Sequence, residues 1–234
     1  MYIVTGVSRG LGKAIVEELL ERNEKVIGVG RSHNFDHSNF SFLECDLSHP
    51  EKINELDFPV LYGSVTLINN AGILGEIKRL SDQTVFDLDK IMMVNVVSPM
   101  CLSQVVYAKV QSKKDFALVN ISSGAANRSI PSWAGYCASK AALNMLTETF
   151  YLEELEKGNH PTVYAVSPGV IDTDMQVQIR STEKANFSSV ENFQELKKSN
   201  SLYSAKEATL RLLDLLKLPF NGQIPQDLRT IETH

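Results

Sequence analysis

The sequence predicts a single-domain α/β fold, in which a doubly wound, mostly parallel sheet of seven strands carries helices on both faces. Seven short apolar runs alternate with helical patterns along the chain, and such alternation implies βαβ units. The chain has 234 residues, enough for one large α/β domain over residues 1–234 and too few for a comfortable second one. No repeat, linker or low-complexity segment divides it.

Hydrophobic periodicity defines the predicted elements. Strands are expected at residues 1–5, 25–29, 41–44, 65–69, 116–121, 162–166 and 222–225. Two long helices are expected at residues 85–109 and 132–157, and shorter helical patterns at 13–20, 50–56, 175–180 and 190–198. Each crossover between parallel strands should be right-handed.

Composition excludes several function classes. Hydrophobic residues make up 43% of the chain, which supports a sizeable core, and the net charge of −5 argues against nucleic-acid binding. The first strand begins at residue 1, so no signal peptide is expected. The long apolar stretch at residues 91–108 contains serine, asparagine, glutamine and proline, which makes it a poor membrane span. We therefore expect neither nucleic-acid nor membrane partners.

Cysteine and histidine placement gives no metal or disulfide pattern. The three cysteines are odd in number and unpatterned, which fits a reduced, cytoplasmic setting. The histidines are His33, His37, His49, His160 and His234. Their positions show no ligand spacing, so no metal site is predicted.

A glycine-rich loop joins the first strand to the first helix. Gly6, Gly10 and Gly12 allow a tight turn and close backbone approach, while the helix N-terminus favours phosphate. Strand, glycine loop and helix in this order are the context that a dinucleotide site needs. The loop residues expected to bind the dinucleotide are Gly6, Ser8, Arg9, Gly10, Leu11 and Gly12.

A tyrosine and a lysine one helical turn apart form a second candidate site. Tyr136 and Lys140 share one helix face. A free tyrosine has a pKa near ~10, and a neighbouring ammonium should lower it. Ser123 lies at the end of an apolar run, and its hydroxyl could face Tyr136 so that a carbonyl oxygen sits between two donors. The pattern predicts a carbonyl-reducing centre, provided that the chain binds a hydride source.

Together these motifs resemble the short-chain dehydrogenase/reductase family, which has a Rossmann fold. The similarity covers nearly the whole chain: residues 5–12, 69–72 and 168–173 match family motifs, and Asn95, Ser123, Tyr136 and Lys140 fall at the catalytic tetrad positions. Residues 133–136, 172–176 and 221–223 are most similar to the sepiapterin reductase and benzil reductase branch.

The resemblance implies a role for each tetrad residue. Tyr136 would be the general acid in reduction, Ser123 would hold the substrate oxygen, and Lys140 would bind the nicotinamide ribose. Asn95 would hold a water that relays protons to Lys140. Two alternatives stay open: Ser122 could replace Ser123, and Asn95 could be a locally bonded amide at a helix bend.

The family's cofactor contacts also continue along the strand ends. The resemblance implies that the cofactor meets Asp46, Leu47, Asn70, Ala71, Gly72, Tyr136, Lys140, Pro168, Gly169, Ile171 and Thr173. The Thr173 hydroxyl and the backbone near Ile171 would meet the nicotinamide carboxamide. A simple cap before Ser48 is the alternative for Asp46, and a tight turn that stabilises the sheet is the alternative for residues 69–72.

Cofactor choice can be argued from charge. An acidic residue at the end of the second strand would bond a ribose 2′-hydroxyl and repel a 2′-phosphate. Gly30 occupies that position, Arg31 follows it, and Arg9 is expected to face the same pocket. Two guanidiniums suit a phosphate, so the sequence predicts NADP(H).

Residues 172–202 are polar with amphipathic pieces, and we expect them to form a lid over the substrate. Trp133 and Met175 are the expected substrate contacts beside Ser123 and Tyr136. A solvated excursion without a gating role is the alternative.

Oligomer formation is predicted from the two long helices at residues 85–109 and 132–157. The first is apolar on more than one face, which predicts a homodimer or homotetramer through these helices. A helix buried within its own domain is the alternative.

These predictions converge on an NADPH-dependent carbonyl reductase for a small aromatic or dicarbonyl ketone of the benzil type. The alternatives are a sepiapterin-type pterin reductase, a 3-oxoacyl carrier-protein reductase and a non-catalytic NADP sensor. A pterin reductase would want an acidic anchor near the C-terminus, for which Asp227 is the candidate. The stretch at residues 224–227 departs from that pattern, which favours the diketone.

Overall fold

A computed structural model of the chain describes residues 1–231 and contains one seven-stranded sheet in the order β3-β2-β1-β4-β5-β6-β7. Every neighbouring pair is parallel. The strands are β1 Tyr2–Thr5, β2 Val26–Gly30, β3 Phe40–Glu44, β4 Val65–Asn69, β5 Phe116–Ile121, β6 Thr162–Ser167 and β7 Pro225–Asp227. The predicted α/β fold is confirmed; residues 232–234, and with them His234, lie outside the described part.

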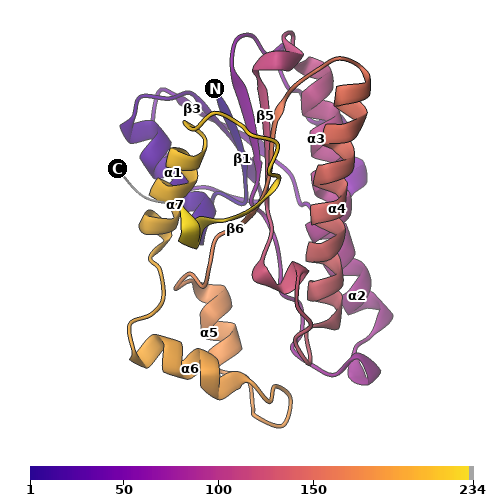
Figure 1. The fold of residues 1–234 in the computed structure, drawn as a ribbon, viewed down its shortest axis with the longest axis vertical. Coiled ribbons are helices and arrows are strands. Elements are labelled where there is room, and N and C mark those ends of the chain that lie inside the picture. Colours follow the sequence, from indigo (N-terminus) through magenta and orange to yellow (C-terminus); the bar gives the residue numbers. More distant parts are fainter. Residues whose placement is uncertain (232–234) are drawn as a thin grey trace.

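Helices cover both faces of this sheet (Figure 1). One face carries α1 (Gly10–Glu21) and α7 (Ala205–Leu215), and the other carries α3 (Ser98–Lys109) and α4 (Ala134–Glu156). Alternate strand residues supply the two cores: Val4 and Ile68 pack with the first pair, whereas Ile3 and Leu67 pack with α3. This two-sided burial explains why the strands read as continuous apolar runs.

Three predicted elements differ in detail. The connection at residues 50–56 forms a 3₁₀ helix, Pro50–Glu55, because the short segment leaves no room for a longer helix. The last strand is shifted from residues 222–225 to Pro225–Asp227, since Gly222 has a φ of 84° and the Gln223 amide bonds the Asn221 side chain in a turn. The expected helix at residues 85–109 is interrupted by a π-helical turn, Met93–Val97, between α2 (Val85–Met92) and α3.

The helical stretch Val85–Lys109 is long and apolar enough to cross a membrane by length and composition alone. The core helix of a soluble protein passes the same test, and 50% of its most apolar window is buried inside this protein. The stretch is therefore weak support for a membrane span.

Because all strands are parallel, their carboxyl ends meet at one edge of the sheet. The glycine loop follows β1, residues 70–72 follow β4, Ser123 follows β5 and residues 168–173 follow β6. The fold therefore brings the predicted motifs to a single edge.

Residues 172–202 leave this edge as an excursion that contains α5 (Asp174–Arg180) and α6 (Val190–Lys198) (Figure 1). Its two ends are joined by an isolated bridge between Ile171 and Tyr203, in which the Asp172 amide donates to the Tyr203 carbonyl at 2.9 Å. The Asp172 carboxylate binds Lys197 of α6 at 2.5 Å and Arg180 of α5 at 3.3 Å. We call residues 172–202 the lid segment.

Candidate active site

Hydrogen bonds between side chains and backbone hold the glycine loop against the end of β4. The Thr5 hydroxyl accepts the amides of Asn70 at 2.9 Å and Ala71 at 2.8 Å, while the Asn70 side chain donates to the Thr5 carbonyl at 2.9 Å. Neutral side-chain amides and hydroxyls thus fix two strand ends against each other. The Asn70–Gly72 turn has the structural role that the sequence left open, and its cofactor contact stays a prediction.

The loop glycines are sterically required. A Cβ on Gly12 would lie 2.3 Å from the Gly6 carbonyl oxygen and 2.4 Å from the Asn70 side-chain nitrogen. Gly6 and Gly10 have φ values of 70° and 57°, which L-residues with side chains rarely adopt. The loop opens onto the N-terminus of α1, a cradle with the shape and polarity that a pyrophosphate needs.

The turn after β6 closes the other side of this cradle. A Cβ on Gly10 would lie 3.4 Å from the Thr173 methyl group, and Gly169 in the same turn has a φ of 83°. The residues around the loop, among them Gly6, Gly10 and Gly12, would therefore fit a nicotinamide dinucleotide.

Tyr136 lies in the first turn of α4 and is 7% exposed. Burial raises the pKa of its phenol, and a hydrogen bond with the Ser123 side chain acts in the opposite direction. Ser122 is buried and donates to the Asn144 side chain at 2.5 Å. Ser123 rather than Ser122 therefore faces Tyr136.

Lys140 lies one turn after Tyr136, and its Nζ is 5.8 Å from the centroid of the tyrosine ring. Nζ donates to the Ile121 carbonyl at 2.8 Å, and burial lowers the pKa of Lys140 to about 8. The expected lowering of the Tyr136 pKa by this ammonium is wrong for this structure, because burial has the larger effect on the phenol. Lys140 is itself desolvated and held by the Ile121 carbonyl.

Asn95 is fully buried in the π-helical turn, a feature that often marks functional positions. Its side chain exchanges two hydrogen bonds of 2.8 Å with the backbone of Ile73 and donates to Ser139 at 3.0 Å. The Asn95 amide is thus satisfied by partners from other parts of the chain rather than by the local bonds of the alternative. A Cβ on Gly72 would lie 3.4 Å from both Asn95 Oδ1 and Lys140 Nζ. The side chains of Asn95 and Lys140 therefore both approach Gly72. The water relay stays a prediction.

The end of β2 leaves room for a ribose. A Cβ on Gly30 would meet only the Gly6 nitrogen, at 3.9 Å, and Arg31 is exposed beside it. The Asp46 carboxylate accepts hydrogen bonds from the Ser48 amide at 3.0 Å and from the Ser48 hydroxyl at 2.8 Å. These bonds lower the pKa of Asp46, and the Arg31 charge adds a smaller effect. The Leu47 carbonyl accepts the Ser98 hydroxyl at 2.6 Å.

Arg9 differs from its predicted placement. Its guanidinium binds Asp174 of α5, with an Nη1–Oδ2 distance of 3.1 Å, instead of standing beside Arg31. The two side chains are 73% and 69% exposed, so this ion pair is weak and its geometry can change. Arg9 therefore links the glycine loop to the lid segment.

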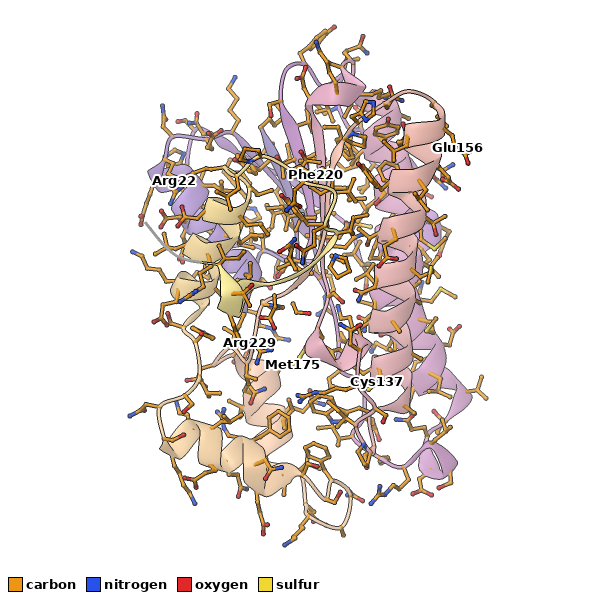
Figure 2. The ribbon with its side chains drawn as sticks, viewed as in Figure 1. Arg22, Cys137, Glu156, Met175, Phe220 and Arg229 are labelled. Atoms are coloured by element: carbon orange, nitrogen blue, oxygen red, sulfur yellow. The ribbon has the colours of Figure 1, made fainter. Side chains whose placement is uncertain are left out.

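An aromatic cluster joins Tyr136 to the lid segment. The Trp133 ring meets Tyr136 edge to face at 5.7 Å, stacks on Phe187 at 5.4 Å and lies 5.5 Å from Phe193 of α6. Met175 of α5 and Cys137 of α4, both labelled in Figure 2, pack against the same cluster. The predicted substrate residues Trp133 and Met175 thus lie beside the proposed acid.

Two adjoining cavities open next to this cluster, of about 470 Å³ and about 330 Å³. Both are lined by Arg128, Ile130 and Val170; the first extends to α6, and the second reaches Ser123 and Asp227. Arg229 binds the Asp227 carboxylate at two oxygens. Arg128 was not predicted, because an arginine in a loop after Ser123 has no distinguishing sequence signal.

Within residues 1–231, no three His, Cys, Asp or Glu side chains are grouped to hold a metal ion, and Cys45, Cys101 and Cys137 are free.

Known proteins are similar to this chain in sequence and in fold. A family model described as short chain dehydrogenase matches residues 1–184. The chain belongs to the short-chain dehydrogenase family. Benzil reductase ((S)-benzoin forming) of Bacillus subtilis is 37% identical over 237 residues and covers 96% of each chain. Sepiapterin reductase of Bos taurus is 33% identical and covers 74% of this chain and 61% of its own.

A solved short-chain dehydrogenase/reductase of Saccharomyces cerevisiae has a TM-score of 0.80 at 28% identity and covers 97% of this chain and 95% of its own. The predicted resemblance to the short-chain dehydrogenase family, and to its sepiapterin and benzil reductase branch, is confirmed. The chain is therefore an oxidoreductase of carbonyl and hydroxyl groups, from a family that uses nicotinamide dinucleotides.

Proposed function

We propose that the protein is an NADPH-dependent reductase of small aromatic or dicarbonyl ketones, with Tyr136 as the general acid. One observation carries this proposal: the hydrogen-bonded Ser123 and Tyr136 lie next to Lys140 at the strand edge that holds the glycine cradle. The short-chain dehydrogenase family, to which the chain belongs, supports the reaction class.

Each tetrad residue has a distinct task in this proposal. Bound NADPH supplies the hydride for the carbonyl carbon. Ser123 and Tyr136 donate hydrogen bonds to the carbonyl oxygen, and Tyr136 gives up its proton as negative charge develops there. Lys140, with a pKa of about 8, can return that proton near neutral pH, and Asn95 orders the surrounding backbone.

The preference for NADPH rests on the end of β2. Gly30 removes the carboxylate that would repel a 2′-phosphate, and the exposed Arg31 offers a guanidinium there. Arg9 can join it only by leaving Asp174, which an exposed ion pair permits at small energetic cost.

The aromatic cluster beside Tyr136 supports an aromatic substrate, because stacked rings offer apolar surface with defined geometry. The name of the Bacillus subtilis relative supports a diketone of the benzil type. A pterin reductase is the second candidate, favoured by Asp227, which lines the same cavity as Ser123. Its carboxylate is held by Arg229, and a pterin would have to displace that partner.

The test is NADPH consumption with benzil, methylglyoxal, sepiapterin and an acetoacetyl thioester. The proposal predicts that benzil has the highest kcat/KM. Sepiapterin in first place would establish the pterin alternative, and the thioester in first place the carrier-protein reductase. No consumption with any carbonyl, despite tight NADPH binding, would favour the NADP sensor and overturn the proposal.

We also propose a cytoplasmic homodimer or homotetramer that assembles through α3 and α4. Met100 on α3 and Met145 and Leu152 on α4 are large apolar side chains that are 47%, 63% and 59% exposed. Contact with a second copy would bury them. Sedimentation that shows only monomer at micromolar concentration would contradict this assembly.

A further inference from the structure

Ser132 and Trp133, directly before α4, carry two buried polar atoms without partners. Among residues 1–231, no hydrogen-bond partner is found for Ser132 Oγ or Trp133 Nε1, although these residues are only 5% and 6% exposed. Buried polar groups nearly always have a hydrogen-bond partner, and a buried group without one needs an explanation. Two orphans at consecutive positions indicate groups that are kept for a ligand.

The backbone at this point is also strained. Ser132 has a φ of 72°, in the left-handed region that serine rarely adopts. Such conformations persist where the surrounding structure holds them, and they cluster at ligand sites. Here the turn delivers Trp133 to the position just before α4.

The ring that carries one of these unpaired atoms lies beside the proposed acid. The Trp133 ring touches Tyr136 edge to face at 5.7 Å, and its face is covered by Phe187. Gln176 of α5 contributes another buried orphan, Oε1, and its neighbour Met175 packs against the same aromatic cluster.

We propose that the Trp133 indole N–H, with the Ser132 hydroxyl, binds the second oxygen of a vicinal dicarbonyl whose first oxygen lies between Ser123 and Tyr136. An indole N–H can only donate, so its partner in the substrate is an acceptor oxygen. This inference rests on the proposed function and specifies its substrate class. A site with a buried donor discriminates against an analogue that lacks the acceptor, because the donor then stays unpaired.

A single resonance tests the contact without turnover. Trp133 is the one tryptophan of the chain, so the ¹⁵N-labelled protein has one indole N–H signal. The protein is saturated with NADP⁺, which cannot reduce a ketone, and titrated with benzil or with deoxybenzoin, which keeps both rings but has one carbonyl. We expect a downfield proton shift with benzil that deoxybenzoin does not reproduce. Equal shifts with both ketones, or no shift with either, would overturn the inference.

Selectivity gives a second test. Trp133→Phe keeps an aromatic ring but removes the donor, and it should lower the benzil-to-deoxybenzoin ratio of kcat/KM about 10-fold. Phe193→Leu is the matched control, since it removes a ring of the same cluster without removing a donor, and it should leave the ratio unchanged. An unchanged ratio in Trp133→Phe, or an equal fall in the control, contradicts the inference.

The inference stays testable if Trp133→Phe does not fold or if the wild type reduces neither ketone. If Trp133→Phe does not fold, Ser132→Gly replaces it, because glycine removes the hydroxyl and accepts the positive φ. Ser132→Gly should then lower the same ratio, and an unchanged ratio would contradict the role of the hydroxyl. If the wild type reduces neither ketone, the proposed function fails, and the indole shift alone decides whether the dicarbonyl is bound.

Discussion

The glycine loop and the lid segment meet at the same edge of the sheet but are held by different forces. Around the loop, buried backbone groups and short hydrogen bonds leave no freedom, as between Thr5 and Asn70. The lid segment is held by aromatic packing on Trp133 and by exposed ion pairs such as Arg9–Asp174. Exposed pairs of this kind contribute about 0–1 kcal/mol.

This difference separates two tasks. In the proposed function the glycine loop is the cofactor half, and its hydrogen bonds to the end of β4 preorganise it. In the proposed function the lid segment is the substrate half: its exposed ion pairs can change at small cost, whereas its aromatic packing on Trp133 is buried.

Tyr136→Phe should separate chemistry from cofactor binding. Removing a general acid costs about 10²–10⁴-fold in rate, so we expect kcat to fall about 10³-fold while the Kd for NADPH stays within about twofold. Steady-state kinetics and fluorescence titration measure the two quantities. Near-normal turnover would show that Tyr136 is not the acid.

Gly12→Ala tests the rigidity of the cofactor half. The added methyl would lie 2.3 Å from the Gly6 carbonyl oxygen. Because that oxygen belongs to the backbone, it cannot move away as easily as the end of a flexible side chain. We expect a loss of about 1–3 kcal/mol in stability, the usual cost of overpacking, together with weakened NADPH binding. Gly124→Ala is the control, since its methyl would meet open space. Equal melting temperatures for the two variants would refute a rigid loop.

Lys140→Met tests the cost of the buried lysine. Folding lowers its pKa from 10.5 to about 8, so between these values the unfolded chain binds more protons and stability rises with pH. Below pH 8 the buried charge opposes folding by roughly 3 kcal/mol. Methionine removes that cost but also loses the bond to the Ile121 carbonyl.

We therefore expect Lys140→Met to be inactive yet more stable than the wild type by about 1–2 kcal/mol at pH 7. The gain should shrink as pH rises from 8 to 10.5. Thermal unfolding at a series of pH values measures this difference. A variant that is less stable at pH 7, or whose gain does not depend on pH, would contradict the assigned cost.

Arg31→Asp should lower kcat/KM for NADPH by about 10-fold or more relative to NADH, because a carboxylate would repel the 2′-phosphate. Kinetics with each cofactor at fixed benzil concentration measure the ratio. A wild-type protein that uses both cofactors equally, or an unchanged ratio in the variant, would defeat the proposed NADPH preference.

Asp174→Asn should have the smallest effect on cofactor preference. It removes the ion pair that links the glycine loop to the lid segment. Releasing Arg9 from its exposed partner should tighten NADPH binding about two- to threefold relative to NADH, within the range of a surface ion pair. The same substitution in an Arg9→Ala background should not alter the ratio. If it still does, Asp174 acts on the cofactor without Arg9.

The halves also differ in how well the sequence predicts them. The strand positions were predictable from apolar runs, and the loop at Gly6, Gly10 and Gly12 was predictable because a glycine required by steric clash leaves a local pattern. Tyr136, Lys140 and Ser123 were predictable from their spacing. The direction of the Tyr136 pKa was not, since it depends on burial by residues distant in sequence.

The unpredicted features all arise from tertiary contacts. The pairing of Arg9 with Asp174 spans 165 positions, and no local pattern encodes it. The π-helical turn at Asn95 reflects bonds to Ile73 and Ser139 from other elements. The orphaned atoms at Ser132 and Trp133 can be recognised only when their whole surroundings are known.

Deuterium transfer from NADPH to benzil tests the proposed carbonyl reduction most directly. NADPH carrying deuterium at both C4 positions of the nicotinamide is incubated with benzil and the wild-type protein, and the benzoin is analysed by mass spectrometry and NMR. We predict one deuterium per benzoin, at the carbinol carbon, and about 10³-fold slower formation with Tyr136→Phe. Benzoin without deuterium, or no product with any carbonyl of the panel, would contradict the claim.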